Sequence, residues 1–311
     1  MLFQRTLRNR VCGAGTGLHS GRVVRFALLP AAPSAGIVFI RTDTHPAVEI
    51  PARAAQVTET RLATTLGRDG VTIGTVEHLL AALHGLGIDN ARVELDGPEV
   101  PIMDGSAAPF VELIRAGGGT IAQSRPKRFV IVKRPIEVRD DDGERFARLE
   151  PASSFEIDCT VDFGHPLIRD QRFQLAASDR TFLREISRAR TFGFARDVEA
   201  MRAAGLALGG SLENAVVVDD YSVQNPEGLR FPDEFVRHKV LDAIGDLALL
   251  GAPLIGRYVA NKSGHALNTR LVAALLDQPR AYELAEFRHR REVGQAGLHL
   301  PAPSLGRLAA V

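Results

Sequence analysis

The pattern of apolar and polar positions in the first half of the chain predicts short strands interrupted by two helices. The predicted strands span 22–29, 36–41 and 91–95, with shorter strands or loops to about 73, and the predicted helices span 76–86 and the segment from the turn at 101–106 to about 116. Thr75 stands at the expected N-cap of the first helix, and glycines at 85 and 87 end it. Three further glycines, Gly117 to Gly119, and the polar stretch to Lys127 are typical of a linker.

The second half repeats this mixture of strands and helices on a larger scale. Strands are predicted over 129–132, 136–138, 145–150, 155–163, 215–218 and 254–260, and helices over 180–187, 197–204, 233–250 and 265–276. Asp233 stands at the expected N-cap of the longest helix. The segment after about 288 is charged and then rich in proline and alanine, so we expect it to be weakly ordered.

Length and an internal similarity suggest two domains. A chain of 311 residues exceeds the usual size of one domain, and the glycine-rich linker favours a division into residues 1–125 and 126–311. The pattern V-x-H-x6-G occurs at 76–85 and again at 236–245, each time before an apolar strand. The match is short, and chance is the alternative. Two copies of one α/β unit would each present a histidine, and a metal ion bound by both would lie between the domains.

Charge and hydropathy exclude several classes of partner. Lys+Arg is 38 and Asp+Glu is 37, so nothing in the net charge favours a nucleic acid. Two short basic runs, at 125–128 and 288–291, are more typical of solvated faces. No segment approaches the roughly 18 consecutive apolar residues of a membrane span, and the N-terminus lacks the apolar block of a secretory signal.

The cysteines point to a reducing compartment. Only Cys12 and Cys159 occur, without the spacing of a metal or redox motif, and Cys159 lies in an alternating strand pattern typical of a small buried hydrophobe. We therefore expect a cytoplasmic protein, and we expect it to be a monomer. Any metal site must then be built from nitrogen and oxygen ligands.

The strongest local signal is the pair His238 and Asp242. Four residues apart on a predicted helix, they lie one turn apart on one face, where both can bind one metal ion. An ordinary hydrogen-bonded pair on a solvated face is the alternative. Leu241 and Ile244 make the helix apolar on several sides, however, and a buried carboxylate is costly without a cation. His78, which follows Glu77 on the first helix, is a second candidate ligand, although such a histidine is usually structural. The HExxH motif of thermolysin-type proteases is absent.

Glycine-bounded loops single out two further histidines, His19 and His265. Asp246 is one turn beyond Asp242 and could orient a histidine from another segment, and an aspartate behind His265 would keep that imidazole protonated, as an acid catalyst requires. Lys239 would lie near the rim, where it could bind an anionic group or be a plain surface lysine. His84 points to another face than His78, and we expect the remaining histidines in loops or on the surface; these are His45, His165, His289 and His299.

Six motifs together resemble a known family. They are Gly15-Thr-Gly-Leu18-His-Ser-Gly21, Thr75-Val-Glu-His78 with Gly87-Ile-Asp-Asn90, Pro101-Ile-Met-Asp-Gly-Ser106, Ser187-Arg-Ala-Arg-Thr-Phe-Gly-Phe194, Phe235-Val-Arg-His-Lys-Val-Leu-Asp-Ala-Ile-Gly-Asp246 and Lys262-Ser-Gly-His-Ala-Leu-Asn268. In this order, over about residues 4–275, they resemble the UDP-3-O-acyl-N-acetylglucosamine deacetylases, zinc enzymes of the committed step of lipid A biosynthesis. The resemblance implies an α+β fold of two duplicated domains, each a layered sandwich of sheet and helix, with the active site between them.

The resemblance also implies a role for each site residue. Zinc would be held by His78, His238 and Asp242, although a nitrogen and oxygen site accepts Fe²⁺ as well. The catalytic residues would be Glu77 as general base, His265 as proton donor with Asp246 behind it, and Thr191 at the oxyanion. Substrate would be contacted by Leu18, Asp162, Phe163, Phe192, Lys239 and Lys262, and the insert at 193–217 would enclose the fatty acyl chain. Ala63 stands where some members of the family carry a cysteine that could interact with the metal, and we expect its absence here not to stop catalysis.

Two other function classes compete with this interpretation. A non-catalytic pair of ligand- or nucleic-acid-binding domains would explain the internal similarity but not the metal-like residues. Another zinc hydrolase, such as a peptidase, would share the metal ligands but not the residues assigned to the uridine end.

Overall fold

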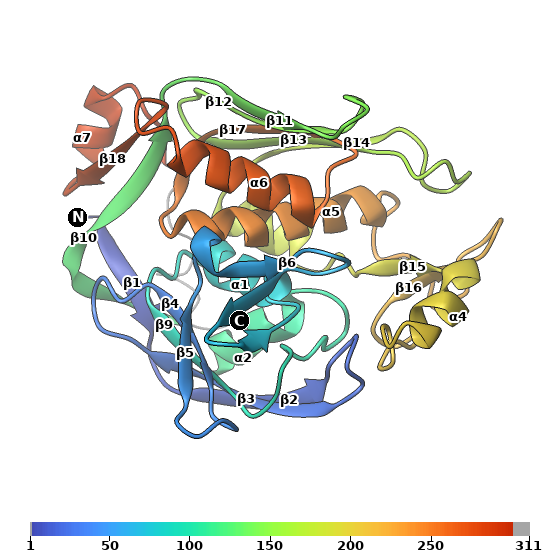
Figure 1. The fold of residues 1–311 in the computed structure, drawn as a ribbon. Helices are drawn as coiled ribbons and strands as arrows, with labels where there is room; N and C mark the ends of the chain where they lie inside the picture. Colours follow the sequence, from blue (N-terminus) through green and yellow to red (C-terminus); the bar gives the residue numbers. More distant parts are fainter. Residues whose placement is uncertain (1, 301–311) are drawn as a thin grey trace.

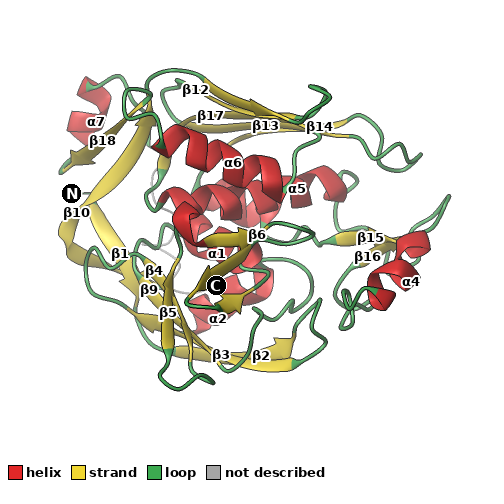
Figure 2. Cartoon of the chain, in the orientation of Figure 1, coloured by secondary structure: helices red, strands yellow, loops and turns green. Residues whose placement is uncertain are grey.

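The computed structural model describes residues 2–300, which form an α+β fold of four layers (Figure 1, Figure 2). The two inner layers are helical and the two outer layers are β-sheets. The main inner helices are α1 (Glu77–Gly85) and α2 (Ala108–Ala116) against the first sheet, and α5 (Glu234–Leu247) and α6 (His265–Leu276) against the second. Within residues 2–300, no helix is both long enough and apolar enough to cross a bilayer.

The first sheet has five strands in the order β2-β3-β9-β4-β5, antiparallel except for the pair β4 and β9. Their bounds are β2 (Val11–Thr16), β3 (Val23–Pro30), β4 (Ile37–Arg41), β5 (Val48–Pro51) and β9 (Ala91–Leu95). Burial alternates along β9, where Ala91, Val93 and Leu95 face the helices. A turn η1 (Ala54–Gln56) leads to a separate small sheet of β6 (Val57–Glu59), β7 (Thr65–Arg68) and β8 (Val71–Ile73).

The second sheet has eight strands and covers the other side of the helices. It contains β1 (Phe3–Leu7), β10 (Thr120–Val132), β11 (Ile136–Arg139), β12 (Phe146–Glu150), β13 (Phe155–Val161), β14 (Gln171–Ala176), β17 (Leu254–Asn261) and β18 (Tyr282–Phe287). The core path is β1-β10-β17-β12-β11, with β13 parallel to β17 and β18 antiparallel to β10. In β12 the buried Ala147 and Leu149 again alternate with less buried neighbours.

The predicted linker is wrong, because residues 120–132 form one continuous strand. In β10, the part from Thr120 to Pro126 pairs with β1, and the part from Lys127 to Val132 pairs with β18. Much of this strand is solvated, which explains its polar sequence. The boundary expected at residue 125 therefore falls inside a strand that belongs to both halves. The division into two duplicated domains stays a prediction.

Shorter elements complete the chain. Along the chain, β14 is followed by α3 (Asp179–Thr181), the π-helical turn η2 (Phe182–Ile186), β15 (Phe192–Phe194), α4 (Ala195–Ala203) and β16 (Val216–Val218). The short helix η3 (Ala248–Leu250) follows α5. Two parallel strands, β15 and β16, with α4 between them, form a small unit that projects from the body in Figure 1.

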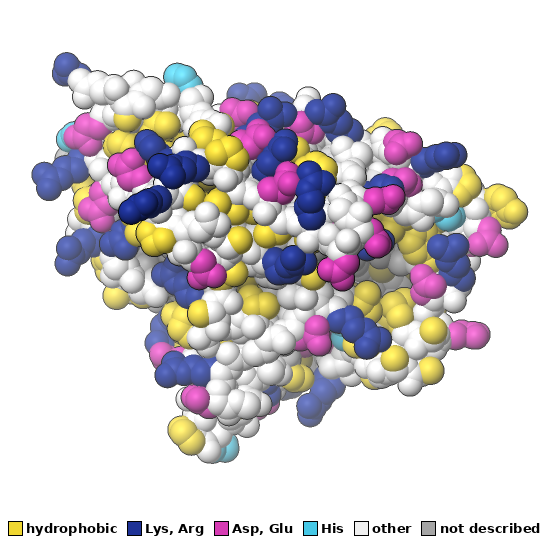
Figure 3. Space-filling model, turned by 45° about the horizontal axis from the view of Figure 1, so that its top comes forward, with side chains coloured by type: hydrophobic (Ala, Val, Ile, Leu, Met, Phe, Trp, Pro, Cys, Tyr) yellow, Lys and Arg dark blue, Asp and Glu magenta, His cyan; other side chains and the backbone are white. Residues whose placement is uncertain are grey.

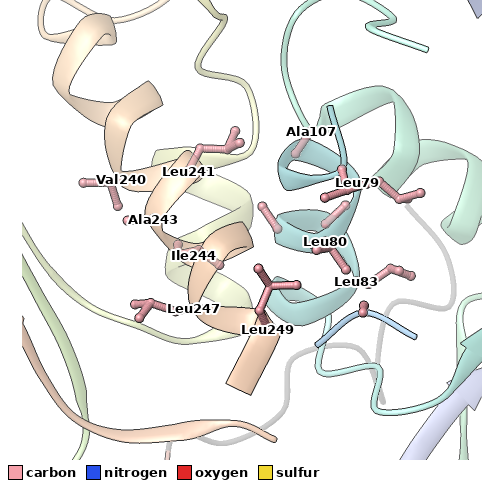
Figure 4. Packing of buried hydrophobic residues seen from close by; sticks show 14 of the residues in the cluster. Leu79, Leu80, Leu83, Ala107, Val240, Leu241, Ala243, Ile244, Leu247 and Leu249 are labelled. Carbon is pink, nitrogen blue, oxygen red and sulfur yellow. The ribbon is translucent and has the colours of Figure 1, made fainter. Parts of the chain in front are cut away.

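Helices α1 and α5 cross in close contact at Gly245. A Cβ atom at this position would lie 2.1 Å from the carbonyl oxygen of Glu77, so only glycine allows the two backbones to approach this closely. Around the crossing, buried leucines of α1 and the buried side chains of α5, among them Leu241 and Ile244, belong to one hydrophobic cluster (Figure 4). The crossing brings the first turn of α1 beside the middle of α5.

The start of α1 differs from the sequence prediction, whereas α5 starts where predicted but without the expected capping bond. Thr75 does not cap α1, because its hydroxyl group donates to Glu99 Oε1 at 2.9 Å and Val76 occupies the N-cap position. Asp233 does occupy the N-cap position of α5, but its carboxylate accepts from Arg237 and makes no capping bond.

The tail is better ordered up to residue 300 than we expected. Residues 290–295 form α7 (Arg290–Gln295), which begins with a capping box between His289 and Glu292. Val293 joins a small second core with Phe129 and Phe287, and this packing holds the segment on the sheet. Residues 301–311, also part of the predicted weakly ordered tail, lie outside the described residues.

A cavity of about 250 Å³ lies at the C-terminal end of α1. Its wall is mostly apolar and includes Phe155, Phe182 and Ile244. His84 lines this cavity with its ring edge-on to Phe155 at a centroid distance of 6.4 Å. Burial, and to a lesser extent the positive charge of Lys127, lowers the pKa of His84 from 6.5 to about 4.

Gly245→Ala is expected to destabilise the protein. Alanine favours a helix by up to about 1 kcal/mol over glycine, but the added methyl group would force α1 and α5 apart, at about 1–3 kcal/mol. We expect a lower free energy of unfolding in urea and lower activity. Gly294→Ala is the matched control, because it also lies in a helix and a Cβ there meets nothing within 4 Å. Equal effects of the two substitutions would show that the close crossing is unimportant.

The free energy of unfolding is expected to decrease as the pH is lowered, partly because of His84. The unfolded imidazole binds a proton near pH 6.5 and the folded one only near pH 4, so stability is complete above pH 6.5 and is lost as the pH falls below it. Between about pH 7.5 and pH 5, the free energy of unfolding should therefore fall by about 1–2 kcal/mol less in His84→Gln than in the wild type. Urea unfolding at both pH values tests this, with the exposed His299→Gln as control. The same pH dependence in wild type and His84→Gln would contradict it.

Candidate active site and metal centre

Five histidine and acidic residues from three helices meet where α1 and α5 cross. Glu77 and His78 form the first turn of α1, and the middle of α5 carries His238 and Asp242. All four side chains are buried, with 2–4% of each residue exposed. His265, the first residue of α6, closes the group. Positions 78 and 238, on which the metal hypothesis depended, are therefore adjacent in space.

His78, His238 and Asp242 form one compact cluster. Each offers a ligand atom, and these atoms lie within 4.8 Å of one another. Asp242 Oδ1 is 3.5 Å from His78 Nε2 and 3.3 Å from His238 Nε2. Within residues 2–300, neither Asp242 Oδ1 nor His78 Nδ1 has a hydrogen-bond partner. A buried carboxylate oxygen without a partner is costly, and a cation between these three side chains would remove that cost.

The donor set fits a divalent cation. His238 Nδ1 lies 3.0 Å from the carbonyl oxygen of Ala189, so Nδ1 donates its proton there and the Nε2 lone pair faces the cluster. Burial lowers the pKa of His238 to about 3, which keeps the ring neutral as a ligand must be. Burial alone would raise the pKa of Asp242, but the nearby charge of Lys239 helps to hold it well below its ordinary value. Two imidazoles and a carboxylate suit Zn²⁺ and also Fe²⁺.

Glu77 lies beside this cluster with one oxygen available. Its Oε2 accepts from the backbone N–H of Thr64 at 3.1 Å, and its Oε1 lies 3.8 Å from His265 Nε2. Burial raises the pKa of Glu77 above its usual value, more than the neighbouring histidines lower it. A carboxylate of raised pKa is a better base near neutral pH.

His265 is held from behind by Asp246. Nδ1 of His265 lies 3.0 Å from Asp246 Oδ2, and this fully buried carboxylate also accepts from Thr64 Oγ1 at 2.6 Å and Asn268 Nδ2 at 2.8 Å. Burial would lower the pKa of His265, but Asp246 and then Glu77 raise it to about 9. The imidazole is therefore protonated at neutral pH, and Nε2 can donate a proton toward the cluster.

A cavity of about 870 Å³ opens over the cluster. Its wall contains Glu77, His78, His238, Asp242 and His265, whereas Asp246 lies behind His265 and does not line it. It also contains five residues to which the family resemblance assigned a role: Leu18, Phe163, Thr191, Phe192 and Lys239. Lys239 Nζ lies 2.7 Å from Asp242 Oδ2, so the lysine is tied to the cluster instead of standing free at a rim. The two other residues expected to contact substrate, Asp162 and Lys262, do not line the cavity. They form an ion pair with each other at 3.2 Å. Asp162 directly precedes Phe163, and Lys262 lies three residues before His265.

The projecting unit of β15, α4 and β16 forms one side of this cavity. Its lining residues include Phe194, Val198, Met201, Leu212 and Val217, most of them apolar. The apolar stretch 206–208 does not join the hydrophobic core: Leu208 is 51% exposed, and Ala207 lines the cavity.

Sequence reasoning missed several residues that position the site. Glu99, buried and without an expected role, accepts from the backbone N–H groups of His19 and Ser20 and so fixes the glycine-bounded loop. Thr64 bonds to both Glu77 and Asp246 from a loop with no recognisable pattern. Asn268 did stand inside a quoted motif, three residues after His265, which was the available signal.

Two further histidines depart from or extend the expectations. His165 lies in the loop between β13 and β14, as expected, but it is buried there, with its Nε2 2.7 Å from the carbonyl oxygen of Asp219 and its ring against Phe194. His19 lines the site cavity, as its glycine-bounded loop suggested.

Comparisons with known proteins agree with the resemblance over almost the whole chain. The sequence profile described as UDP-3-O-acyl N-acetylglycosamine deacetylase matches residues 4–277. A UDP-3-O-acyl-N-acetylglucosamine deacetylase of Myxococcus xanthus is 58% identical over 295 residues, which cover 95% of this chain and 93% of the relative. Proteins of the same name from Anaeromyxobacter dehalogenans and Shewanella violacea are 55% and 53% identical, covering 96% and 94% of this chain and 96% and 95% of the relatives. The chain belongs to the UDP-3-O-acyl-N-acetylglucosamine deacetylase family.

Proposed function

We propose that the protein hydrolyses the N-acetyl group of UDP-3-O-[(3R)-3-hydroxyacyl]-N-acetylglucosamine with the side chains gathered where α1 and α5 cross. The products are acetate and the UDP-3-O-acyl-glucosamine with a free amine, and the reaction is the committed step of lipid A biosynthesis. The observation that carries this proposal is the meeting of His78, His238 and Asp242 beside Glu77 and His265 in one large cavity.

The metal ligands of the proposal are His78, His238 and Asp242. The ion would be Zn²⁺, with Fe²⁺ as the alternative that the same donors accept. When bound, it supplies a Lewis acid that polarises the acetamide carbonyl and lowers the pKa of water. The orphaned Oδ1 of Asp242 and the Nε2 lone pair of His238 support this assignment.

Glu77 and His265 divide the proton transfers between them. Glu77 takes a proton from the water that attacks the acetamide carbon, since its raised pKa suits a base near neutral pH. The resulting oxyanion is stabilised by Thr191 or by the N–H of His265. His265 then protonates the departing nitrogen, because an amide nitrogen leaves poorly as an anion, and Asp246 stabilises the charged imidazole until that step.

Substrate would lie along the cavity from the uridine end to the acyl chain. Lys239, Phe192 and Leu18 line the cavity near the cluster and would contact the sugar and its acyl group. At the uridine end we place Phe163 with Asp162 and Lys262. The apolar side chains of the unit at 193–217 would enclose the acyl chain, since they line the cavity on one side.

The architecture behind this site is proposed to be a duplication. Residues 1–125 and 126–311 would be two copies of a layered unit of sheet and helix, each supplying one histidine to the metal. Support comes from α1 and α5, which share the pattern V-x-H-x6-G and place Gly85 and Gly245 where a Cβ would clash, at 2.3 Å from Phe182 and 2.1 Å from Glu77.

We further propose that the protein acts as a cytoplasmic monomer without a nucleic-acid partner. Both cysteines are free, which suits a reducing compartment. Acidic and basic side chains are interspersed over the face shown in Figure 3, without a broad basic patch of the kind that nucleic acids require.

The test of the function is substrate choice. The proposal expects acetate release from the UDP-3-O-acyl sugar and little from simple N-acetyl sugars or N-acetylated peptides. Rapid release from the simple compounds would instead indicate a different amide hydrolase, and no release from any of them by metal-loaded protein would favour a non-catalytic role.

Glu77→Gln should keep the metal and lose turnover. Because the amide is close in shape to the carboxylate but is not a base, we expect kcat to fall by about 10²–10⁴ with bound zinc unchanged. Acetate release and zinc content per chain are measured on the same sample. Glu112→Gln, on the exposed face of α2, is the control. Wild-type turnover in Glu77→Gln would remove Glu77 from its role.

Removing the metal should abolish activity reversibly. Prolonged treatment with a chelator is expected to stop acetate release, and adding about one equivalent of Zn²⁺ should restore it. Asp242→Asn should bind zinc at least about tenfold more weakly, because the amide is a poor ligand, whereas the exposed Asp277→Asn should bind it as wild type does. Full activity in chelator-treated protein verified to be free of metal would contradict the metal assignment.

A further inference from the structure

Arg190 is a fully buried guanidinium group that the proposed reaction does not use. It is 2% exposed, and its partner Glu234, at the start of α5, is 0% exposed. Nε and Nη2 of Arg190 donate to the two oxygens of Glu234 at 2.9 and 3.1 Å, and the backbone N–H of Arg190 also donates to Glu234 at 2.9 Å. This arrangement fixes both the side chain and the backbone of Arg190 against α5.

The same segment holds the ligand histidine one turn further along. Glu234 and His238 are four residues apart and lie on one face of α5. Ala189, directly before Arg190, accepts the Nδ1 proton of His238 at 3.0 Å. Two consecutive residues therefore bind two positions one helical turn apart, so the place of the Ala189 carbonyl depends on the bond between Arg190 and Glu234.

Thr191, directly after Arg190, is the proposed oxyanion residue. Its backbone N–H donates to the carbonyl of Gly105 at 2.8 Å, and its own carbonyl accepts from Val216 at 2.8 Å. Its side chain lines the site cavity. The orientation of Thr191 is thus set on one side by these backbone bonds and on the other by Arg190.

The charge pair also reaches the N-terminal half of the chain. Glu234 Oε2 accepts from the backbone N–H of Arg230 at 2.6 Å, and the Arg230 side chain donates to Asp104 at 2.8 Å and to the carbonyl of Arg188 at 3.1 Å. Arg190 itself further binds Glu227 and the carbonyl of Gly228. The hydrogen bonds of Arg190 and Glu234 therefore join three segments of the chain: residues 188–191, residues 227–230 and the start of α5.

Stability alone is a weak reason for such a pair. Removing two charges from water costs several kcal/mol per ion, and buried ion pairs are often replaced by apolar side chains without loss of stability. A bidentate Arg–carboxylate fork, by contrast, fixes one relative orientation of two segments, which lysine cannot reproduce.

We propose that Arg190, acting through Glu234, is a positioning residue that sets the orientation of the metal ligand His238 and of Thr191. It does not touch the substrate or the ion. The proposal rests on the proposed function, because it assumes that His238 binds a divalent cation.

The experiment compares Arg190→Lys and Glu234→Gln with Arg237→Lys. Arg237 is the matched control, since it is a largely buried arginine that lies, like Glu234, in α5. Its side chain forms ion pairs with Asp233 and Glu185 and none with the segment 189–191 among the described residues. Zinc affinity is measured by competition with a chelating dye. The Co²⁺-substituted proteins are compared by visible absorption, kcat and KM by acetate release, and stability by urea unfolding of the metal-free proteins.

We expect Arg190→Lys and Glu234→Gln to weaken zinc binding by about 10–100-fold, change the Co²⁺ spectrum and lower kcat more than KM changes, because a partner that orients a ligand typically contributes this much. Arg237→Lys should alter stability only. If all three variants bind zinc as wild type does and give its Co²⁺ spectrum, the positioning role is wrong. If wild type itself binds no divalent cation, the proposed function fails first, which separates the two outcomes.

Discussion

The close crossing of α1 and α5 at Gly245 is the constraint on which the rest of the structure depends. The missing side chain lets the backbone of Glu77 rest directly on α5. Only at this separation do His78 from one half and His238 and Asp242 from the other lie within 4.8 Å of one another. The large apolar contacts around the crossing hold this approach in place, so the packing of the core and the geometry of the site are one problem.

Around the crossing, the protein environment shifts the pKa values of two buried histidines in opposite directions. Two histidines, His238 and His265, are buried alike, yet their pKa values move in opposite directions, to about 3 and about 9. The difference comes from the partners: a backbone carbonyl accepts from His238, whereas the carboxylate of Asp246 accepts from His265. One ring is therefore suited to binding a cation and the other to carrying a proton, and the same residue type serves both purposes within one cavity.

The sequence predicted the parts of the site that depend on local spacing. His238 and Asp242 are one turn apart on a helix, and Gly264 directly before His265 singled out that histidine, so both could be found without coordinates. The meeting of His78 with them depended on the internal similarity and on the resemblance to a family. Ala189 and Thr64 could not be found, because a backbone carbonyl and a lone threonine in a loop carry no pattern. Most predicted strands and helices match elements of the structure, but β1, β2, β14 and β18 were not predicted. The strand predicted at 129–132 is the end of β10, whose first part was taken for a linker because its solvated residues have a linker's composition.

The continuous strand β10 also has a consequence for how a long amphiphile enters. One part of β10 pairs with β1 of the first half and the other with β17 and β18 of the second, so the two halves share a single strand. Spreading the halves apart would also break the buried contact of α1 with α5, where the site lies. The unit of β15, α4 and β16 forms one side of the cavity and is tied to the body where Leu208 and Gly209 donate to the carbonyls of His19 and Leu18. If the proposed function is right, a flexible hydrocarbon tail would have to pass beside this tied loop, and the cavity would receive it without the two halves moving apart.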